Sequence, residues 1–152
     1  MTKKLLILLF FLGTSFLYSQ NSVWRTSMDD AMAISKDEGK PMLILFTSSN
    51  ASEALQNEVF KSADFTVWSR DNVVLVKLDL SDINADDNTK QQNLRLKNAF
   101  GVDELPQVCF ANASVGKNKT TFTALGKIGY KSEGAKSWIS ESNAILHPSD
   151  TE

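Results

Sequence analysis

The stretch MLILFTSSNASEALQNEVF, residues 42–60, decides how this chain folds. It begins with five apolar residues in a row, and a run of that length directly after Pro41 predicts a β-strand covered on both faces. A serine-rich turn follows. Apolar residues then recur at helical spacing up to Phe60, which predicts a helix from about Ala51 to Lys61.

The rest of the chain alternates helices and strands around this stretch. Upstream, a helix is predicted between Ser27, the expected N-cap, and Gly39, the expected stop. Downstream, the predicted elements are a short helix in residues 62–71, a strand in VVLVKLDL (73–80), a helix carrying Leu94 to Phe100, strands in QVCFA (107–111) and TTFTAL (120–125), and a helix around Trp138. This order predicts an α/β sandwich with a mixed sheet.

The amino-acid composition excludes several classes of function. Charged residues make up 22% of the chain and hydrophobic residues 42%, which is typical of a globular protein, and no basic stripe indicates nucleic-acid binding. With one cysteine, Cys109, and one histidine, His147, the chain has no internal disulfide, and we predict no metal site and no cofactor. The acidic loop at residues 82–88 lacks the glycine of a calcium loop and is predicted to be solvated.

The first twenty residues are typical of a secretory signal peptide. Lys3 and Lys4 precede an apolar run that is too short for a stable membrane span, and small and polar residues follow up to Gln20. We therefore expect a signal peptide at 1–20, one domain at 21–148, a short tail at 149–152, and export to the periplasm or exterior of a bacterium. Without the signal the chain would carry 14 basic and 18 acidic residues.

Several local motifs, in order, resemble the thioredoxin superfamily, in particular its exported bacterial branch. GKPMLILF (39–46) is similar to the segment that enters the active-site strand, NEVF (57–60) to the end of the active-site helix, and FGVDELPQVCF (100–110) to the segment that carries the family's proline. The resemblance implies a three-layer sandwich with a central mixed β-sheet flanked by helices. It also implies that Pro106 is a cis-proline facing the active site.

The departure from the family falls at that site. The family's two cysteines align with Ser49 and Ser52, so the CxxC motif is missing. Thioredoxins attack a disulfide with a thiolate held at a helix amino end, and a second thiol resolves the mixed disulfide. A serine hydroxyl forms no comparable anion near neutral pH. We therefore expect a redox-inactive domain, and the sequence favours a protein that is not an enzyme.

The polar turn has two interpretations. Ser49, Asn50 and Ser52 are residues that cap helices, each by accepting a bond from a free backbone N–H. Alternatively, they form a polar notch that holds an anion or a peptide carbonyl. In the family, the residue before the cis-proline pairs with an extended substrate segment, which here assigns that role to Leu105. An ordinary trans Pro106 at a strand entrance stays open as the alternative.

Two functions of different classes follow. The first is a non-catalytic domain that binds an extended polypeptide or an envelope or secreted partner protein through the Leu105–Pro106 edge and the Ser49–Ser52 turn. The second is a single-thiol oxidoreductase that uses Cys109 with an external thiol. A cysteine in an apolar strand is usually a small buried hydrophobe, so we expect Cys109 in the core. Binding of a partner through another surface stays open, and the sequence predicts no oligomeric state.

Overall fold

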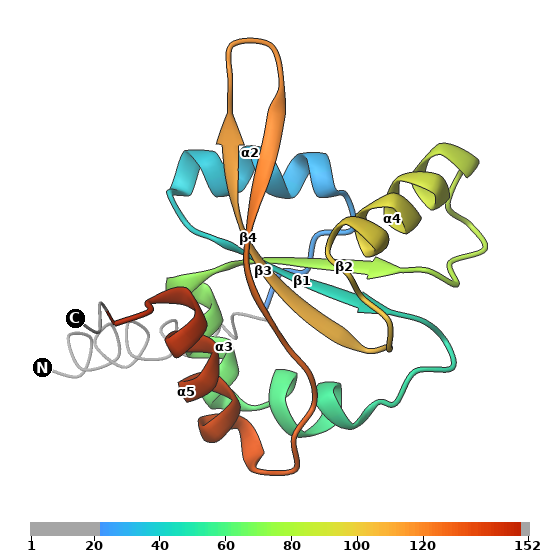
Figure 1. The fold of residues 1–152 in the computed structure, drawn as a ribbon. Coiled ribbons are helices and arrows are strands. Elements are labelled where there is room, and N and C mark those ends of the chain that lie inside the picture. The colour runs from blue at the N-terminus through green and yellow to red at the C-terminus, as the bar shows by residue number, and fades with distance from the viewer. Residues whose placement is uncertain (1–21, 150–152) are drawn as a thin grey trace, which may run out of the picture.

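The computed structural model describes residues 22–149 and shows an α/β sandwich (Figure 1). Its elements are α2 (Met28–Glu38), β1 (Met42–Thr47), η1 (Gln56–Phe60), α3 (Ala63–Asn72), β2 (Val74–Asp79), α4 (Asp87–Ala99), β3 (Gln107–Val115), β4 (Thr120–Ile128) and α5 (Gly134–Leu146). Within these residues no helix has the length and apolar character needed to cross a membrane. The predicted signal peptide and residues 150–152 lie outside the described part of the chain.

The four named strands form one mixed sheet in the order β2-β1-β3-β4. β1 and β2 are parallel, whereas β3 is antiparallel to both β1 and β4. Residue Arg25 extends the sheet beyond β2, because its N–H donates to the Leu75 carbonyl at 2.8 Å and its carbonyl accepts from the Lys77 N–H at 2.7 Å. The predicted three-layer arrangement with a central mixed sheet is confirmed.

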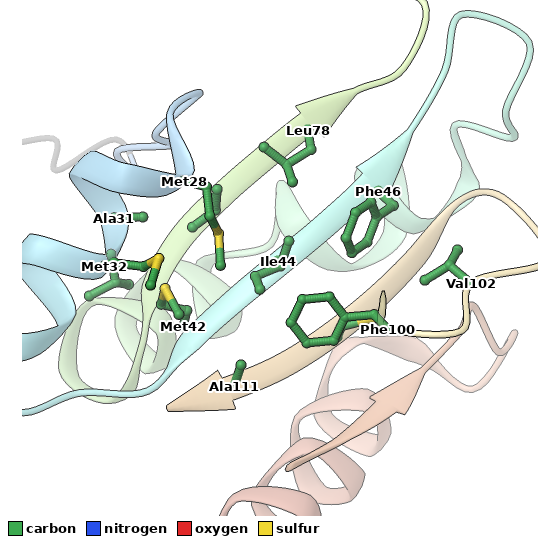
Figure 2. Close-up of a cluster of buried hydrophobic side chains, with 13 residues drawn as sticks. Met28, Ala31, Met32, Met42, Ile44, Phe46, Leu78, Phe100, Val102 and Ala111 are labelled. Atoms are coloured by element: carbon green, nitrogen blue, oxygen red, sulfur yellow. The ribbon is translucent and has the colours of Figure 1, made fainter. Parts of the chain in front are cut away.

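Alternation along β1 divides the core into two halves. Met42, Ile44 and Phe46 point to the face covered by α2 and α4, where they meet buried methionines of α2 and Phe100 (Figure 2). Leu43 and Leu45 point to the opposite face, which η1, α3 and α5 cover. A central strand buried on both faces is what the continuous apolar run in residues 42–46 predicts.

Aromatic side chains fill the second half of the core. Trp138 of α5 is 1% exposed and packs edge-on against Phe60 and Trp68, with ring centroids 5.7 and 6.2 Å apart. Its indole Nε1 donates to the Gly129 carbonyl at 3.1 Å, so burial leaves no polar atom of the ring unpaired. Trp68 and Trp138 therefore both lie in this half of the core.

The end signals of α2 act as the sequence predicts. Ser27 is the N-cap, and its hydroxyl accepts the Asp30 N–H at 3.3 Å. Gly39 ends the helix with φ of 64°, a left-handed conformation that glycine adopts without a Cβ penalty.

The β3–β4 hairpin is longer than the sequence predicts. β1 pairs only with Gln107–Ala111 of β3, so the remainder of the hairpin projects past the sheet (Figure 1). A bulge at Phe110/Ala111 shifts the register between β3 and β4. The predicted strands at 107–111 and 120–125 stop short of Val115 and Ile128, where β3 and β4 end.

Candidate functional site

The turn after β1 differs from the prediction at one end. Residues 48–53 form turns and bends, and helical structure begins only at Ala54, so the expected start at Ala51 is wrong. The Ala51 N–H donates to the Ser48 carbonyl at 3.0 Å, which closes a turn where the sequence pattern predicts a first helical turn. From Gln56 to Phe60 the segment is a π-helix.

Hydrogen bonds tie this turn to the end of β2. The backbone N–H of Ser49 donates to the Ser81 hydroxyl at 2.7 Å, and that hydroxyl donates to the Asp79 carboxylate at 2.6 Å. Ser52 accepts the Ala54 N–H at 3.3 Å. The side chains of Ser49 and Asn50 accept no hydrogen bond within residues 22–149, so of the three candidate caps only Ser52 bonds a backbone N–H near the helix start.

The turn and the proline line one cavity. Ser49, Ser52 and Pro106 lie on the wall of a polar pocket of about 160 Å³, whereas Asn50 and Leu105 do not. Lys77 and Asp79 of β2 also line it. Sequence reasoning missed these two residues. The alternation of side chains along a strand could have identified them. Positions 77 and 79 share one face at the carboxyl end of β2, and binding residues are common at the carboxyl ends of parallel strands.

The segment before β3 leaves main-chain groups free. The Leu105–Pro106 peptide bond is cis. Pairing of β3 with β1 begins at Gln107, opposite Phe46. Within the described residues, neither the N–H nor the carbonyl of Leu105 makes a hydrogen bond. Its side chain packs against the first half of the core, which fixes the backbone in place.

Cys109 lies in the core, as the sequence predicts. Its side chain is fully buried in the half of the core under α2, and Ile44 and Lys127 are its neighbours on the adjacent strands. Burial raises the pKa of the Cys109 thiol to about 12, against a smaller lowering by Lys127. A thiol that is buried and protonated at neutral pH is a poor nucleophile. This position argues against the single-thiol oxidoreductase.

Together, the mixed sheet, the helices on both of its faces and the proline beside the turn after β1 define a thioredoxin-like domain. The chain belongs to the thioredoxin-like domain family, whose sequence model matches residues 28–122. With Cys109 as its one cysteine, this member has no cysteine pair at the family's redox site.

Comparison with known proteins shows that the chain is similar to bacterial Dsb proteins in sequence and in fold. It is 30% identical over 92 residues to the thioredoxin-related protein DsbJ of Chlamydia pneumoniae, a match that covers 58% of this chain and 26% of that protein. The chain thus spans about a quarter of the length of this relative. Among solved structures, a DsbH oxidoreductase superposes with a TM-score of 0.70 at 20% identity over 86% of this chain and 88% of its own.

A second solved structure shares the fold. A thioredoxin from Thermus thermophilus superposes with a TM-score of 0.62 at 13% identity, over 84% of this chain and 88% of its own. At such low identity the likeness shows a common fold.

Proposed function

We propose that this domain is a non-catalytic thioredoxin-like module that binds an extended polypeptide segment along Leu105 and the Ser49–Ser52 turn. The segment belongs to a partner protein of the cell envelope or of the secreted fraction. The domain, residues 21–148, acts after export to the periplasm or the cell exterior, and the predicted signal at 1–20 directs that export.

One observation carries the proposal. The backbone N–H and carbonyl of Leu105 are both unpaired within the described residues, although its side chain is anchored in the core. An unpaired donor and acceptor on one fixed residue form a short strand edge, and an extended peptide satisfies both groups by adding to such an edge. Water pairs with them in the free protein, so the binding energy comes from additional contacts around the edge.

The polar cavity supplies such contacts. Ser49 and Lys77 both line this cavity, and the Ser49 hydroxyl and the Lys77 ammonium have no hydrogen-bond partner within residues 22–149. Hydroxyl and ammonium donors suit the carbonyl oxygens of a peptide. The Ser49–Ser81–Asp79 hydrogen bonds hold the turn in one position, so little conformational freedom is lost on binding.

The test is a nuclear magnetic resonance titration. A permanently unfolded polypeptide, reduced and alkylated at its cysteines, is added to the ¹⁵N-labelled protein. We expect saturable shifts at Ser49 and Leu105, together with slower hydrogen exchange of the Leu105 amide, because that N–H gains a partner.

Two tryptophan variants distinguish binding at this site from nonspecific binding. Ser49→Trp fills the cavity, whereas Ser114→Trp places the same side chain on an exposed position of β3 outside the cavity. We expect Ser49→Trp to weaken binding about tenfold or more, a loss of about 1.4 kcal/mol, and the control to bind like the unaltered protein. Equal binding by the two variants contradicts the proposal.

A further inference from the structure

A second cavity lies along the outer edge of β2, between the segment that precedes α2, the end of α2 and α3. Its volume of about 460 Å³ is within the size range of small-molecule sites. It shares no residue with the pocket at the Ser49–Ser52 turn. The apolar residues on its wall are Val23, Ile34, Val73, Val74 and Leu75.

Most of this apolar wall is held in place by the core. Val73, Val74 and Leu75 are buried, and Ile34 packs against the first half of the core. An apolar ligand that enters a wall of this kind removes apolar surface from water. Because the wall is already ordered, little conformational freedom is lost on binding.

A buried hydroxyl on the same wall has no hydrogen-bond partner. Ser22 Oγ is the one buried side-chain nitrogen or oxygen atom among residues 22–149 that is left unpaired. Buried polar groups in proteins are almost always paired, and an unpaired one destabilises the fold. Because Ser22 lines the cavity, its unpaired hydroxyl points to a ligand group that completes the hydrogen bond.

The main chain of β2 adds a second unpaired donor. The Val74 N–H donates to the Pro41 carbonyl at 2.9 Å on the β1 side, so the main chain of Leu75 faces the outer edge. The Leu75 carbonyl accepts the Arg25 N–H at 2.8 Å, whereas the Leu75 N–H makes no hydrogen bond within residues 22–149. Leu75 is 5% exposed and lines the cavity, so this donor is also buried at its wall.

The charged residues on the wall are Arg25, Glu38 and Arg70. The Glu38 carboxylate binds the Lys40 ammonium at 3.0 Å, and the Arg70 guanidinium binds the Asp71 carboxylate at 2.8 Å. The Arg25 guanidinium makes no ion pair and no hydrogen bond within the described residues. An unpaired cation beside an unpaired N–H and an unpaired hydroxyl suits an anion.

We propose that this cavity binds a carboxylate with an apolar chain, of the fatty-acid type. The Arg25 guanidinium pairs with the ligand carboxylate, the Leu75 N–H and the Ser22 hydroxyl donate to its oxygens, and the chain lies against the apolar wall. The planar fork of a guanidinium matches the two oxygens of a carboxylate. This site is separate from the peptide edge at Leu105, so either proposal can fail alone.

The test titrates the ¹⁵N-labelled protein, produced from the complete 152-residue sequence, with decanoate below its micelle-forming concentration. We expect saturable shifts at the Leu75 amide and at the side-chain Nε–H of Arg25. The shorter hexanoate is expected to bind at least about tenfold more weakly, because each buried methylene group adds affinity. Decanol and decylammonium carry the same chain without the negative charge and are also expected to bind about tenfold more weakly or less.

Two glutamine variants test the role of the guanidinium. Arg25→Gln removes the positive charge but keeps the main-chain hydrogen bond to Leu75. We therefore expect decanoate to bind about tenfold more weakly or less, while decanol binds as it does to the unaltered protein. Arg95→Gln, at an exposed position of α4 outside the cavity, is expected to bind decanoate normally.

Four results overturn the proposal. One is that decanoate gives no saturable shifts at Leu75 and Arg25 in the unaltered protein, a measurement that needs no variant to fold. Another is that hexanoate binds as tightly as decanoate, which leaves the apolar wall without a role. A third is that decanol or decylammonium binds as tightly as decanoate, which leaves the negative charge without a role. The last is that Arg25→Gln binds decanoate with unaltered affinity.

Discussion

Burial of Cys109 links the stability of this protein to alkaline pH. The pKa of the thiol rises from an ordinary value of 9.0 to about 12 on folding, chiefly because the thiolate would lose its hydration. Between these two values the folded state holds a proton that the unfolded state has released. The contribution of this thiol to the free energy of unfolding therefore stays constant below pH 9 and falls above it, by about 1.4 kcal/mol for each pH unit up to about 12.

Replacement of Cys109 by alanine isolates this effect. Alanine has no ionisable group, and loss of the buried sulfur destabilises the protein by about 1 kcal/mol at neutral pH. Ionisation of the thiol in the unfolded state destabilises only the unaltered protein. The difference in free energy of unfolding between the unaltered protein and Cys109→Ala should therefore shrink and then change sign, a change of about 1.4 kcal/mol between pH 7 and pH 10. Urea denaturation at these pH values measures both free energies.

A thiol assay gives an independent readout. With a pKa of about 12, about one thiol in 10⁵ is a thiolate at pH 7, so a chromogenic disulfide should react with the denatured protein and hardly with the native one. A difference between Cys109→Ala and the unaltered protein that stays constant from pH 7 to pH 10 would refute the reasoning. Rapid reaction of the native thiol would do the same and would restore the single-thiol oxidoreductase as a function.

Three further predictions concern stability. Gly126→Ala places a Cβ at 2.8 Å from Cγ2 of Ile145, so we expect chemical denaturation to show a loss of about 1–2 kcal/mol in the free energy of unfolding, and a smaller loss in an Ile145→Ala background. Gly129→Ala, whose Cβ meets nothing within 4 Å, is the control and should leave stability unchanged, so equal effects of the two glycine changes would contradict the packing. Ser62→Ala removes the N-cap hydroxyl of α3 and should lower the free energy of unfolding by about 1 kcal/mol, and an unchanged midpoint would show that the cap is redundant. The Asp86 side chain accepts the backbone N–H of Thr89 at the start of α4, and this hydrogen bond is the main cause of the lowered pKa of Asp86. The contribution of Asp86 to the stability of the folded state is therefore present above about pH 4 and is lost as the pH falls further. In Asp86→Ala, this part of the acid sensitivity should be missing from a pH titration followed by circular dichroism.

Much of the fold is readable from the sequence because the relevant signals are local. The buried strand at 42–47, the caps of α2 and the burial of Cys109 each depend on a few neighbouring residues. The late helix start at Ala54 is different. Leu55, Val59 and Phe60 suit an α-helix and the observed π-helix alike, so apolar spacing cannot show where the first turn forms.

The candidate sites depend on contacts between distant segments. Ser81 and Ser49 are 32 positions apart in the sequence, and neither segment contains a pattern that predicts the hydrogen bond between them. Asn93 illustrates the same limit, because the sequence pattern predicts that a polar residue in a polar helix is solvent-exposed, whereas Asn93 is 6% exposed. At the opposite extreme, Leu94 is apolar and is half exposed. Only three-dimensional placement distinguishes the two.

The conformation of the turn after β1 has a consequence for any attempt to build a redox centre into this domain. Because helical structure begins only at Ala54, a cysteine introduced at Ser49 would stand several residues ahead of the first helical N–H groups. Its thiol would lack the helix field that lowers the pKa of a thioredoxin cysteine. Cysteines introduced at Ser49 and Ser52 would therefore give the letters of the CxxC motif without its reactivity, and dithiol chemistry at this site would also require rebuilding the loop.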